Sequence, residues 1–332
     1  MCALFGWLDY KGILSHRTLK RLTQALANAA EERGTDASGI SYVKNGQIVI
    51  FKQPKRAHRI HFNPPDGTSA VMGHTRMTTQ GSEKLNYNNH PFPGYAGKQF
   101  ALAHNGVLFN DDTLRKIKNL PVTRIQTDSY VAVQLIERQR NLSFDSLRSM
   151  AEDVRGNFTF TVLDEDNSLY IVKGSNPMFL VHFESFGLYV YASTKTILYN
   201  ALNHTGMQRI AHKVIHTTEG DIIQISQSGN LSRSHFMPQD PYGFLGWYDD
   251  DYDLYTPHEQ LLMDYCHSCG IDCEDVALLL EYGYTADEIE DLFTDHDMLL
   301  STINDIKYEE YAYENECGEE NKGCAFWTPA KC

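Results

Sequence analysis

The sequence predicts an α+β fold in which β-sheets are layered with helices. Apolar runs with strand-like composition occur in the first 110 residues and again in residues 157–236, and helical patterns lie between them. Sheets and helices of one chain bury their apolar faces against one another, which favours a layered arrangement. The composition then shifts near residues 238–253, which are rich in Pro, Gly, Asp and Tyr, so a separate C-terminal region is expected to follow.

The part of the chain up to residue 153 is expected to contain five strands and four helices. Ser15 is a suitable N-cap for a helix that stops at Gly34. The pair Asn45-Gly46 is typical of a tight turn between two strands. Residues 77–98 are polar and rich in Asn, Gly and Pro, so we expect a long loop there. The expected strands are residues 1–9, 38–43, 47–51, 69–74 and 99–103, and the expected helices are residues 15–32, 111–119, 128–139 and 142–153.

The next 80 residues follow a different pattern, made mostly of strands. A short helix near residues 194–202 interrupts them. Their apolar runs are short and bounded by turn residues, as in the strands of a packed sheet. The expected strands are residues 157–164, 168–173, 178–183, 187–193, 221–226 and 231–236.

We divide the chain into a main domain (2–237), a linker (238–255), a small acidic helical region (256–306) and an acidic tail (307–332). The tail is poor in apolar residues and rich in charge, so we expect it to lack stable structure. Helices are predicted at residues 258–269, 274–282 and 286–293. The second is expected to be capped by Asp272, and the third by a capping box of Thr285 and Glu288.

Charge is distributed unevenly between these regions. Residues 240–332 hold 24 acidic residues and three lysines, a net charge of −21, whereas the whole chain carries −14, so residues 1–239 carry +7. The acidic part either stays solvated or docks on a basic surface, of its own body or of a partner. It would repel phosphates, which argues against nucleic acid as a ligand.

The chain also shows no pattern for a membrane or for export. No stretch approaches the length of a membrane span, and the N-terminus lacks a basic segment followed by an apolar one. We therefore expect a cytoplasmic protein whose thiols stay reduced.

Cys2 is the first candidate for chemistry. Removal of Met1 before this small side chain would make Cys2 the N-terminal residue. Its thiolate could then act as a nucleophile and its free α-amine as a base, directly or through a water molecule. Because any protein can have a cysteine at position 2, this signal needs others beside it.

Three short patterns supply groups that such a nucleophile would need. Arg76 ends a strand at the entrance of the long loop and could hold a carboxylate in two parallel hydrogen bonds. Asn105 and Gly106 also end a strand and could present an amide and a backbone N–H as an oxyanion hole. Asp128 at a helix start could pair with an amine. The ordinary alternatives are a surface arginine, a hairpin turn and a helix cap.

The order of these patterns carries a family resemblance. The segments CALFGW, RGTDASGI, GHTRMTTQG, NNHPF, HNG and TDS occur in the order seen in class II glutamine amidotransferases, which are N-terminal-nucleophile hydrolases. The sequence resembles the glutaminase domain of glutamine–fructose-6-phosphate transaminase and its stand-alone relatives over roughly residues 2–235. Six short motifs in one order are far more specific than any one of them.

The resemblance implies a four-layer αββα sandwich and the hydrolysis of the glutamine side-chain amide. In that reaction Cys2 attacks the amide carbon, and Asn105 and the Gly106 N–H stabilise the oxyanion. Ammonia leaves, and water hydrolyses the γ-glutamyl thioester to glutamate. The resemblance implies no cofactor, and we expect no metal in this site.

The resemblance also assigns substrate-binding residues. Arg76 would bind the α-carboxylate of glutamine and Asp128 its α-ammonium, which together fix the amide that reaches the thiol. Arg33 would help to order the nucleophile, and Thr79 would line the glutamine pocket.

The chain departs from the family in its loop and in its length. Many relatives have tryptophan where this chain has Met77, and often histidine where it has Gln80, which bears on loop closure more than on hydrolysis. The well-known family members attach a synthase domain that uses the ammonia. The residues after 240 show no phosphate-binding glycine loop, so we expect a separate partner enzyme to accept the ammonia.

The other six cysteines lie after residue 265. Their clustering and the odd total of seven do not resemble a secreted disulfide framework. Cys266, Cys269 and Cys273, with Cys317 and Cys324, could supply zinc ligands, but the paired CxxC spacing is missing. The spacing of three and four residues favours a buried apolar stripe of a helix.

Two other functions stay open from the sequence. The same site could hydrolyse a different γ-glutamyl amide or peptide, because Arg76 and Asp128 would read only the glutamyl end. A different class is a non-catalytic glutamine-sensing or scaffold protein that acts through its acidic helical region. No oligomeric state is predicted.

Overall fold

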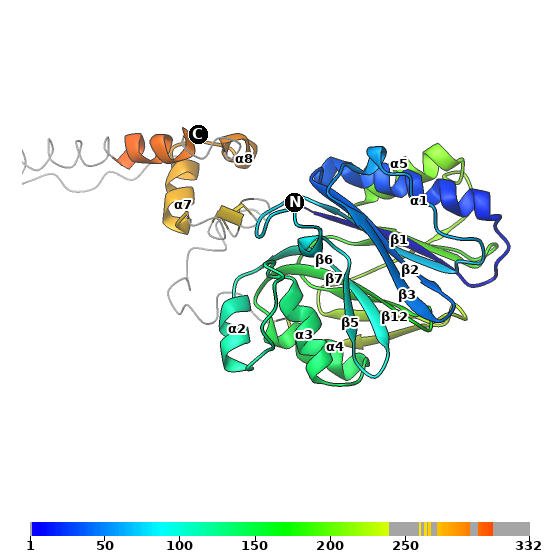
Figure 1. Ribbon diagram of the computed structural model, residues 1–332. Coiled ribbons are helices and arrows are strands. Elements are labelled where there is room, and N and C mark those ends of the chain that lie inside the picture. Colours follow the sequence, from blue (N-terminus) through cyan, green and yellow to red (C-terminus); the bar gives the residue numbers. More distant parts are fainter. Residues whose placement is uncertain are drawn as a thin grey trace, which may run out of the picture. The chain divides into compact units, whose positions relative to one another are not determined.

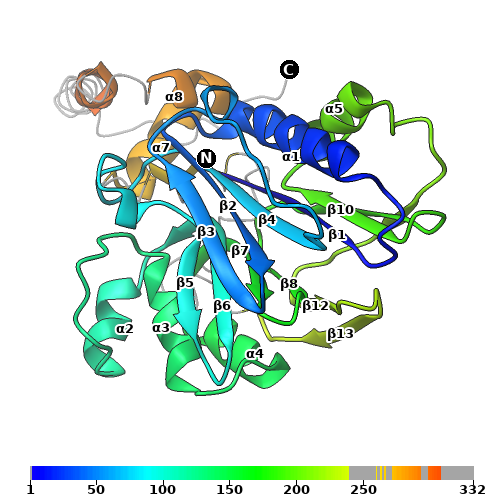
Figure 2. The same cartoon turned by 45° about the vertical axis from the view of Figure 1, so that its right-hand side comes forward.

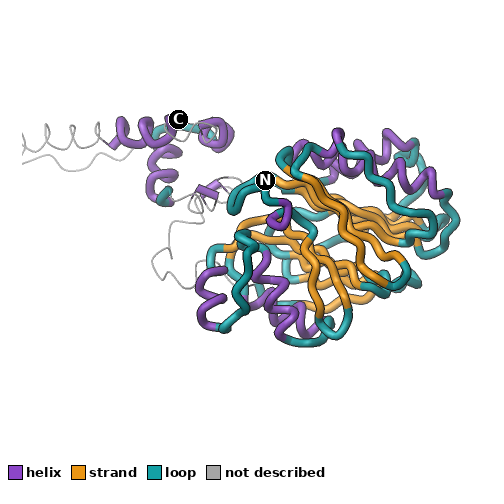
Figure 3. Tube along the Cα trace, viewed as in Figure 1, coloured by secondary structure: helices purple, strands orange, loops and turns teal. Residues whose placement is uncertain are grey.

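The computed structural model describes residues 2–238, 259, 262, 263, 265, 266, 271–292 and 298–307. Contacts divide the chain into two compact units, Met1–Leu245 and Gly246–Cys332. In the described residues, all strands belong to the first unit and the second unit is helical. Figure 3 shows the strands of the first unit gathered between its helices.

The first sheet has seven strands, and β1 lies in its middle. The strand order is β11-β9-β10-β1-β4-β2-β3, and every pair is antiparallel. The turn between β2 and β3 has positive φ at Asn45 and Gly46, as a tight hairpin requires. The strands are β1 Ala3–Asp9, β2 Ala37–Lys44, β3 Gln47–Gln53, β4 Ala70–Arg76, β9 Phe179–Phe183, β10 Leu188–Ala192 and β11 Lys213–Ile215.

The second sheet has six strands in the order β13-β12-β8-β7-β6-β5, again all antiparallel. Its longest strand, β6, pairs with β7 along nine residues, from Phe100 opposite Asp164 to Leu108 opposite Gly156. The strands are β5 Phe92–Tyr95, β6 Gln99–Leu108, β7 Gly156–Asp164, β8 Leu169–Lys173, β12 Asp221–Ile225 and β13 Leu231–His235.

Helices cover the outer face of each sheet (Figures 1 and 2). On the first sheet lie α1 and α5, and on the second lie α3 and α4 with α2 beside them. The Ser15 side chain caps α1 by accepting from the Thr18 N–H, as predicted. The helices are α1 His16–Ala30, α2 Asp111–Ile117, α3 Tyr130–Arg138, α4 Phe144–Asp153 and α5 Lys195–Thr205, and the 3-10 turns are η1 Glu31–Arg33, η2 Ala57–Arg59 and η3 Asn86–Asn88.

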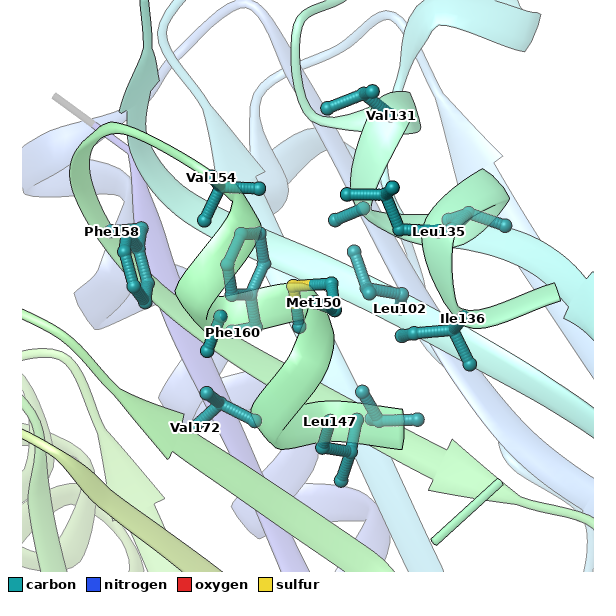
Figure 4. Packing of buried hydrophobic residues seen from close by; sticks show 14 of the residues in the cluster. Leu102, Val131, Leu135, Ile136, Leu147, Met150, Val154, Phe158, Phe160 and Val172 are labelled. Carbon is teal, nitrogen blue, oxygen red and sulfur yellow. The ribbon is translucent and has the colours of Figure 1, made fainter. Parts of the chain in front are cut away.

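Three apolar clusters hold the four layers together. One lies between α1, α5 and the first sheet, and another between α3, α4 and the second sheet, where Met150, Leu135 and Phe160 meet (Figure 4). The third lies between the two sheets and includes Leu4 and Leu163. The predicted four-layer αββα sandwich is therefore confirmed.

Burial on both faces explains why β1 is a continuous apolar run rather than an alternating one. Phe5 and Trp7 pack against the helical layer, whereas Leu4 and Leu8 pack against the other sheet. Because side chains alternate along a strand, Cys2 belongs on the same face as Leu4. The sequence thus directs Cys2 toward the space between the sheets.

Several expectations for individual elements were wrong. The expected loop at residues 77–98 contains β5 and η3, and β11 was not predicted. The strand expected to end at residue 103 continues to Leu108. The polar pattern of these segments hides strands, because β5 carries Pro and Gly and β6 carries His104, Asn105 and Gly106.

The second unit has its own small apolar core. In its described part, α7 (Cys273–Glu281), α8 (Ala286–Leu292) and the helical residues 298–307 contribute Val276, Ile289 and Ile303 to it. The capping box is confirmed: Thr285 and Glu288 exchange hydrogen bonds of 2.8 and 3.3 Å. Asp272 takes the N-cap position of α7 but makes no side-chain cap bond.

Other expectations for the C-terminal region lie largely outside the described residues. These are most of the linker, most of the tail and most of the predicted helix 258–269. The helix at residues 298–307 was not predicted as an element. Within the described residues, no helix is long and apolar enough to cross a membrane.

Candidate active site

The register of the first sheet places Cys2 beside Arg76. β1 and β4 are antiparallel, with Ala3 opposite Thr75 and Leu4 opposite His74. One further step along this register brings Cys2 opposite Arg76, and side chains directly opposite each other project from the same face. Contacts around Cys2 agree with this placement: its Sγ lies 3.4 Å from the carbonyl oxygen of Met77.

Arg33 binds the backbone of Cys2. Its Nε donates to the Cys2 carbonyl oxygen at 3.1 Å, so it fixes the backbone rather than the thiol. Arg33 ends the 3-10 turn that follows α1. The start of β1 is therefore tied to the helical layer at the residue that carries the thiol.

Several charged groups act on the Cys2 thiol. Burial raises its pKa, the positive charges of the chain's N-terminal amine and of Arg76 lower the pKa, and the carboxylate of Asp128 raises it. Cys2, Arg76 and Asp128, which come from the start of β1, the end of β4 and the segment before α3, are thus close enough to interact by charge.

Arg76 is buried and bound to neutral oxygens. Its guanidinium donates to Asn89 Oδ1 at 2.7 Å, to the Gln80 carbonyl at 2.5 Å and to the Gly81 carbonyl at 3.0 Å. Burial lowers its pKa, while Cys2 and Asp128 oppose that shift. The surface-arginine alternative is excluded, because only 3% of Arg76 is exposed.

Asp128 is a buried carboxylate that does not cap a helix. Its Oδ2 accepts from the Leu108 N–H at 2.7 Å, and its Oδ1 accepts from the Ser129 hydroxyl at 3.2 Å. Ser129, not Asp128, takes the N-cap position of α3. Burial raises the pKa of Asp128, and the N–H of Leu108 and the charge of Arg76 oppose the rise.

Asn105 lies inside β6, opposite Thr159, and not in a hairpin turn. Its side-chain Nδ2 reaches to 3.5 Å from Ser193 Oγ, and its carbonyl accepts from Asn176 Nδ2 at 3.0 Å. Ser193 directly follows β10 of the first sheet, and its N–H donates to the Leu4 carbonyl at 2.9 Å. The Asn105 amide therefore approaches β1, the strand that follows Cys2.

Gly106 can only be glycine. Its φ is +140°, a region that other residues avoid. A Cβ atom built on it would lie 1.8 Å from the Asn157 carbonyl oxygen. The backbone N–H next to Asn105 is therefore held in a conformation that no other residue would adopt.

Thr79 and Gln80 lie next to each other on the loop after β4. Thr79 is exposed between β4 and η3, so its place in a pocket stays a prediction. Its neighbour Gln80 is better anchored: Gln80 Oε1 accepts from the Asp128 N–H at 2.7 Å. Gln80 thus bonds Arg76 through its main chain and Asp128 through its side chain.

Sequence reasoning missed Ser193, Asn176, Asn89 and the anchoring role of Gln80. Ser193 follows β10 and precedes the Thr194 cap of α5, so its pattern is that of an ordinary helix start. Asn89 lies in the NNHPF segment, which is one of the motifs that carried the family resemblance, so the sequence did indicate this region. Ser193 gave none, because its role depends on strand pairing across 189 residues.

In the part of the chain that the structure describes, no three His, Cys, Asp or Glu side chains are grouped to hold an ion. Cys266 is buried in the apolar core of the second unit, in line with the expected apolar stripe. Cys269, Cys317 and Cys324 lie outside the described residues.

Comparison with known proteins shows which family the chain resembles. Residues 74–200 match the family described as glutamine amidotransferase domain. Glutamine–fructose-6-phosphate aminotransferases of Geobacillus kaustophilus and Bacillus cereus are 26% and 28% identical over 249 and 250 residues, which is 72% of this chain. By these matches the chain resembles glutamine amidotransferases. The matched family range contains Arg76, Asn105, Gly106 and Asp128 and begins after Cys2.

This chain spans less than half the length of these two relatives. The alignments span 40% of the two aminotransferases, so more than half of each relative has no counterpart here. What those proteins do as a whole therefore does not transfer to this chain.

Two solved structures share the fold of this chain. The glutamine phosphoribosylpyrophosphate amidotransferase of B. subtilis aligns with a TM-score of 0.55 and 18% identity, over 72% of this chain and 50% of that one. A structure described as the allosteric regulatory enzyme of purine biosynthesis aligns with a TM-score of 0.57, also at 18% identity over 72% and 50%. At this identity the likeness supports the fold alone.

Proposed function

We propose that this protein hydrolyses the side-chain amide of glutamine, with the Cys2 thiol as nucleophile after removal of Met1. The observation that carries the proposal is the convergence of Cys2 with a buried cation and a buried carboxylate, Arg76 and Asp128, each of which acts on the thiol by charge. A free amino acid carries the complementary pair of charges. Binding both would fix the distance from its α-carbon to the thiol.

The proposed reaction has two halves. The Cys2 sulfur attacks the amide carbon, its proton passes to the α-amine of Cys2, and the carbonyl electrons move to oxygen. The Asn105 amide and the Gly106 N–H donate to that oxyanion. When the tetrahedral intermediate collapses, the C–N bond breaks, and the amine-held proton leaves with the nitrogen as ammonia.

Water completes the second half of the reaction. It adds to the thioester carbon, and the C–S bond breaks to release glutamate and restore the thiol. The α-amine again holds and returns the proton. Arg33 would keep the Cys2 backbone in place through its bond to the Cys2 carbonyl oxygen, and Thr79 would line the glutamine pocket.

The ammonia is proposed to serve a separate acceptor enzyme. The curated relatives are named aminotransferases and are more than twice as long as the matched region. In this chain, the second unit is a small helical body with a core of its own in the described residues. We propose residues 2–237 as the glutaminase and a cytoplasmic partner as the ammonia user.

Glutamate release from L-glutamine tests the proposal. The Cys2→Ser variant should lose roughly a thousandfold in kcat/KM, as removal of a nucleophile does in other hydrolases. Cys266→Ser changes a thiol buried in the second unit and should leave turnover unchanged. Equal loss in both variants, or turnover in Cys2→Ser at the unmodified rate, would overturn the proposal.

The same assay separates the alternative substrates. A γ-glutamyl dipeptide shares the α-carboxylate and α-ammonium of glutamine but has a larger leaving group. Faster turnover of the dipeptide than of glutamine would favour the γ-glutamyl hydrolase. Tight glutamine binding without turnover by any variant would favour the sensing protein.

A further inference from the structure

The Ser129 hydroxyl does not cap the helix at whose start it lies. Ser129 takes the N-cap position of α3, where serine ordinarily accepts from a backbone N–H of the first turn, but it makes no such bond. Its Oγ instead donates to Asp128 Oδ1 at 3.2 Å and lies 2.8 Å from His104 Nδ1. All three residues are buried, so these bonds are shielded from water.

The direction of the hydrogen bonds follows from proton count. The Ser129 hydroxyl has one proton, and the Asp128 carboxylate can only accept when ionised. With that proton on the bond to Asp128, His104 Nδ1 must carry its own proton and donate it to Ser129. Burial lowers the pKa of His104 to about 3, so this imidazole stays neutral and holds a single ring proton.

The same histidine is tied to the other site strands. Its carbonyl oxygen accepts from His74 Nε2 at 2.9 Å, and His74 precedes Arg76 by two residues on β4. His104 also directly precedes Asn105 on β6. One buried network therefore joins the strands of Arg76 and Asn105 to the carboxylate of Asp128.

We propose that Ser129 and His104 are positioning residues that orient the Asp128 carboxylate and keep it ionised for the α-ammonium of the substrate. The inference rests on the proposed function of the site. It explains why Ser129 leaves the helix N–H groups uncapped: a buried carboxylate needs donors more than the helix does. The Ser129 hydroxyl supplies one donor, and the backbone N–H groups of Leu108 and Ser129 supply others.

Other ionisable groups face Asp128 and also affect its pKa. Arg76 on β4 and the Cys2 thiol before β1 both act on it by charge. Asp111 on α2 also faces it, and Arg115 holds Asp111 at 3.3 Å. None of these contacts includes Ser129, so a change at Ser129 leaves them in place.

Ser129→Ala is the decisive variant. The acid limb of kcat/KM for L-glutamine should move up by about one pH unit, because Asp128 loses a donor to its charged form. KM should rise roughly tenfold with a smaller change in kcat, since Asp128 touches the ammonium and not the amide. Ser129→Thr keeps the hydroxyl and should restore both values. Ser146→Ala removes another buried helix-start serine, whose hydrogen bonds with Ser143 form the α4 capping box, and should change neither value.

Two NMR measurements keep the inference testable without turnover. The Asp128 carboxyl carbon, assigned with Asp128→Asn, should titrate at higher pH in Ser129→Ala than in the unmodified protein or in Ser146→Ala. The ring nitrogens of His104 in the unmodified protein should show the neutral form with the proton on Nδ1.

An unchanged Asp128 titration in Ser129→Ala would overturn the proposed role of Ser129 and His104, and so would a His104 ring proton on Nε2. Failure of the proposed function looks different, because the unmodified protein would then not hydrolyse glutamine at all. In that case the NMR titrations still decide whether Ser129 and His104 control Asp128.

Discussion

At the residue scale, Asp128 shows that a group suited to binding can weaken the folded state. Burial raises its pKa, so between the ordinary carboxyl pKa and this raised value the native protein holds a proton that the unfolded chain has lost. Stability therefore falls as pH rises through that window. A carboxylate kept in such a place is explained by a cationic ligand better than by folding.

Asp128→Asn should accordingly stabilise the protein at neutral pH, by on the order of 1 kcal/mol, while it weakens glutamine binding. Asparagine keeps an oxygen to accept from Leu108 and carries no charge to desolvate. Urea unfolding at pH 7.5 and at pH 4 measures this, and the gain over the unmodified protein should shrink at the lower pH. A variant that is less stable at both pH values would show that Asp128 is structural.

At the element scale, the loop after β4 is organised by the two proposed substrate-binding residues. Arg76 holds the Gln80 and Gly81 carbonyls, and the Asp128 N–H bonds the Gln80 side chain. Asn88 and Asn89 fix the far part of the loop by bonds to Ser82 and Glu83. Gln80 is therefore the point where the loop meets both ends of the proposed ligand site.

Gln80→Ala should raise the KM for glutamine roughly tenfold and leave thermal stability nearly unchanged. The lost bond is one neutral acceptor on an exposed side chain, so its main effect is on loop position. Gln139→Ala removes an exposed glutamine that bonds Ser149 away from the site and serves as the matched control. The same KM in both variants would mean that Gln80 does not set the loop.

Elements with clear apolar periodicity could be predicted from the sequence, whereas polar strands could not. The helices and the strands of the core match their expected ranges within a few residues, because burial requires their patterns. The end of β6 was missed because Asn105 and Gly106 resemble a turn when read locally. What keeps them in a strand is pairing with Thr159 and Phe158, about 50 residues away.

The candidate site was predicted through ordered motifs, but its support was not. Cys2, Arg76 and Asp128 were named from the sequence, and the structure brings them within range of one another. Ser193 reaches Asn105 only because the two sheets stack, and Asn176 reaches it from the segment after β8, where it also bonds Thr159 of β7. No local pattern contains that information. Such supporting residues become visible only when the fold is known.

At the scale of the whole molecule, three buried histidines tie folding to pH. Burial lowers the pKa of His74 and of His104 to about 3, and it lowers that of His90 well below 6.5. The unfolded chain would protonate all three below their ordinary pKa of 6.5 while the native protein does not. Stability is therefore fully present above pH 6.5 and is lost progressively as pH falls toward 3.

His90→Leu should flatten that loss, because neither ring nitrogen of His90 has a hydrogen-bond partner in the described structure. Urea unfolding between pH 7 and pH 4 should show a smaller change in unfolding free energy for this variant than for the unmodified protein. His204→Asn alters an exposed histidine on α5 and should keep the original slope. An unchanged slope in His90→Leu would contradict neutral burial of that ring.

The most direct test of the central claim is the intact mass of untagged protein before and after treatment with 6-diazo-5-oxo-norleucine, a reactive glutamine analogue. We predict that Met1 is absent, that one covalent adduct forms, and that the adduct maps to Cys2 and is missing from a Cys2→Ala control. Retention of Met1 in protein from the native host would contradict the N-terminal-nucleophile mechanism, and an adduct that persists in Cys2→Ala would contradict the assignment of Cys2.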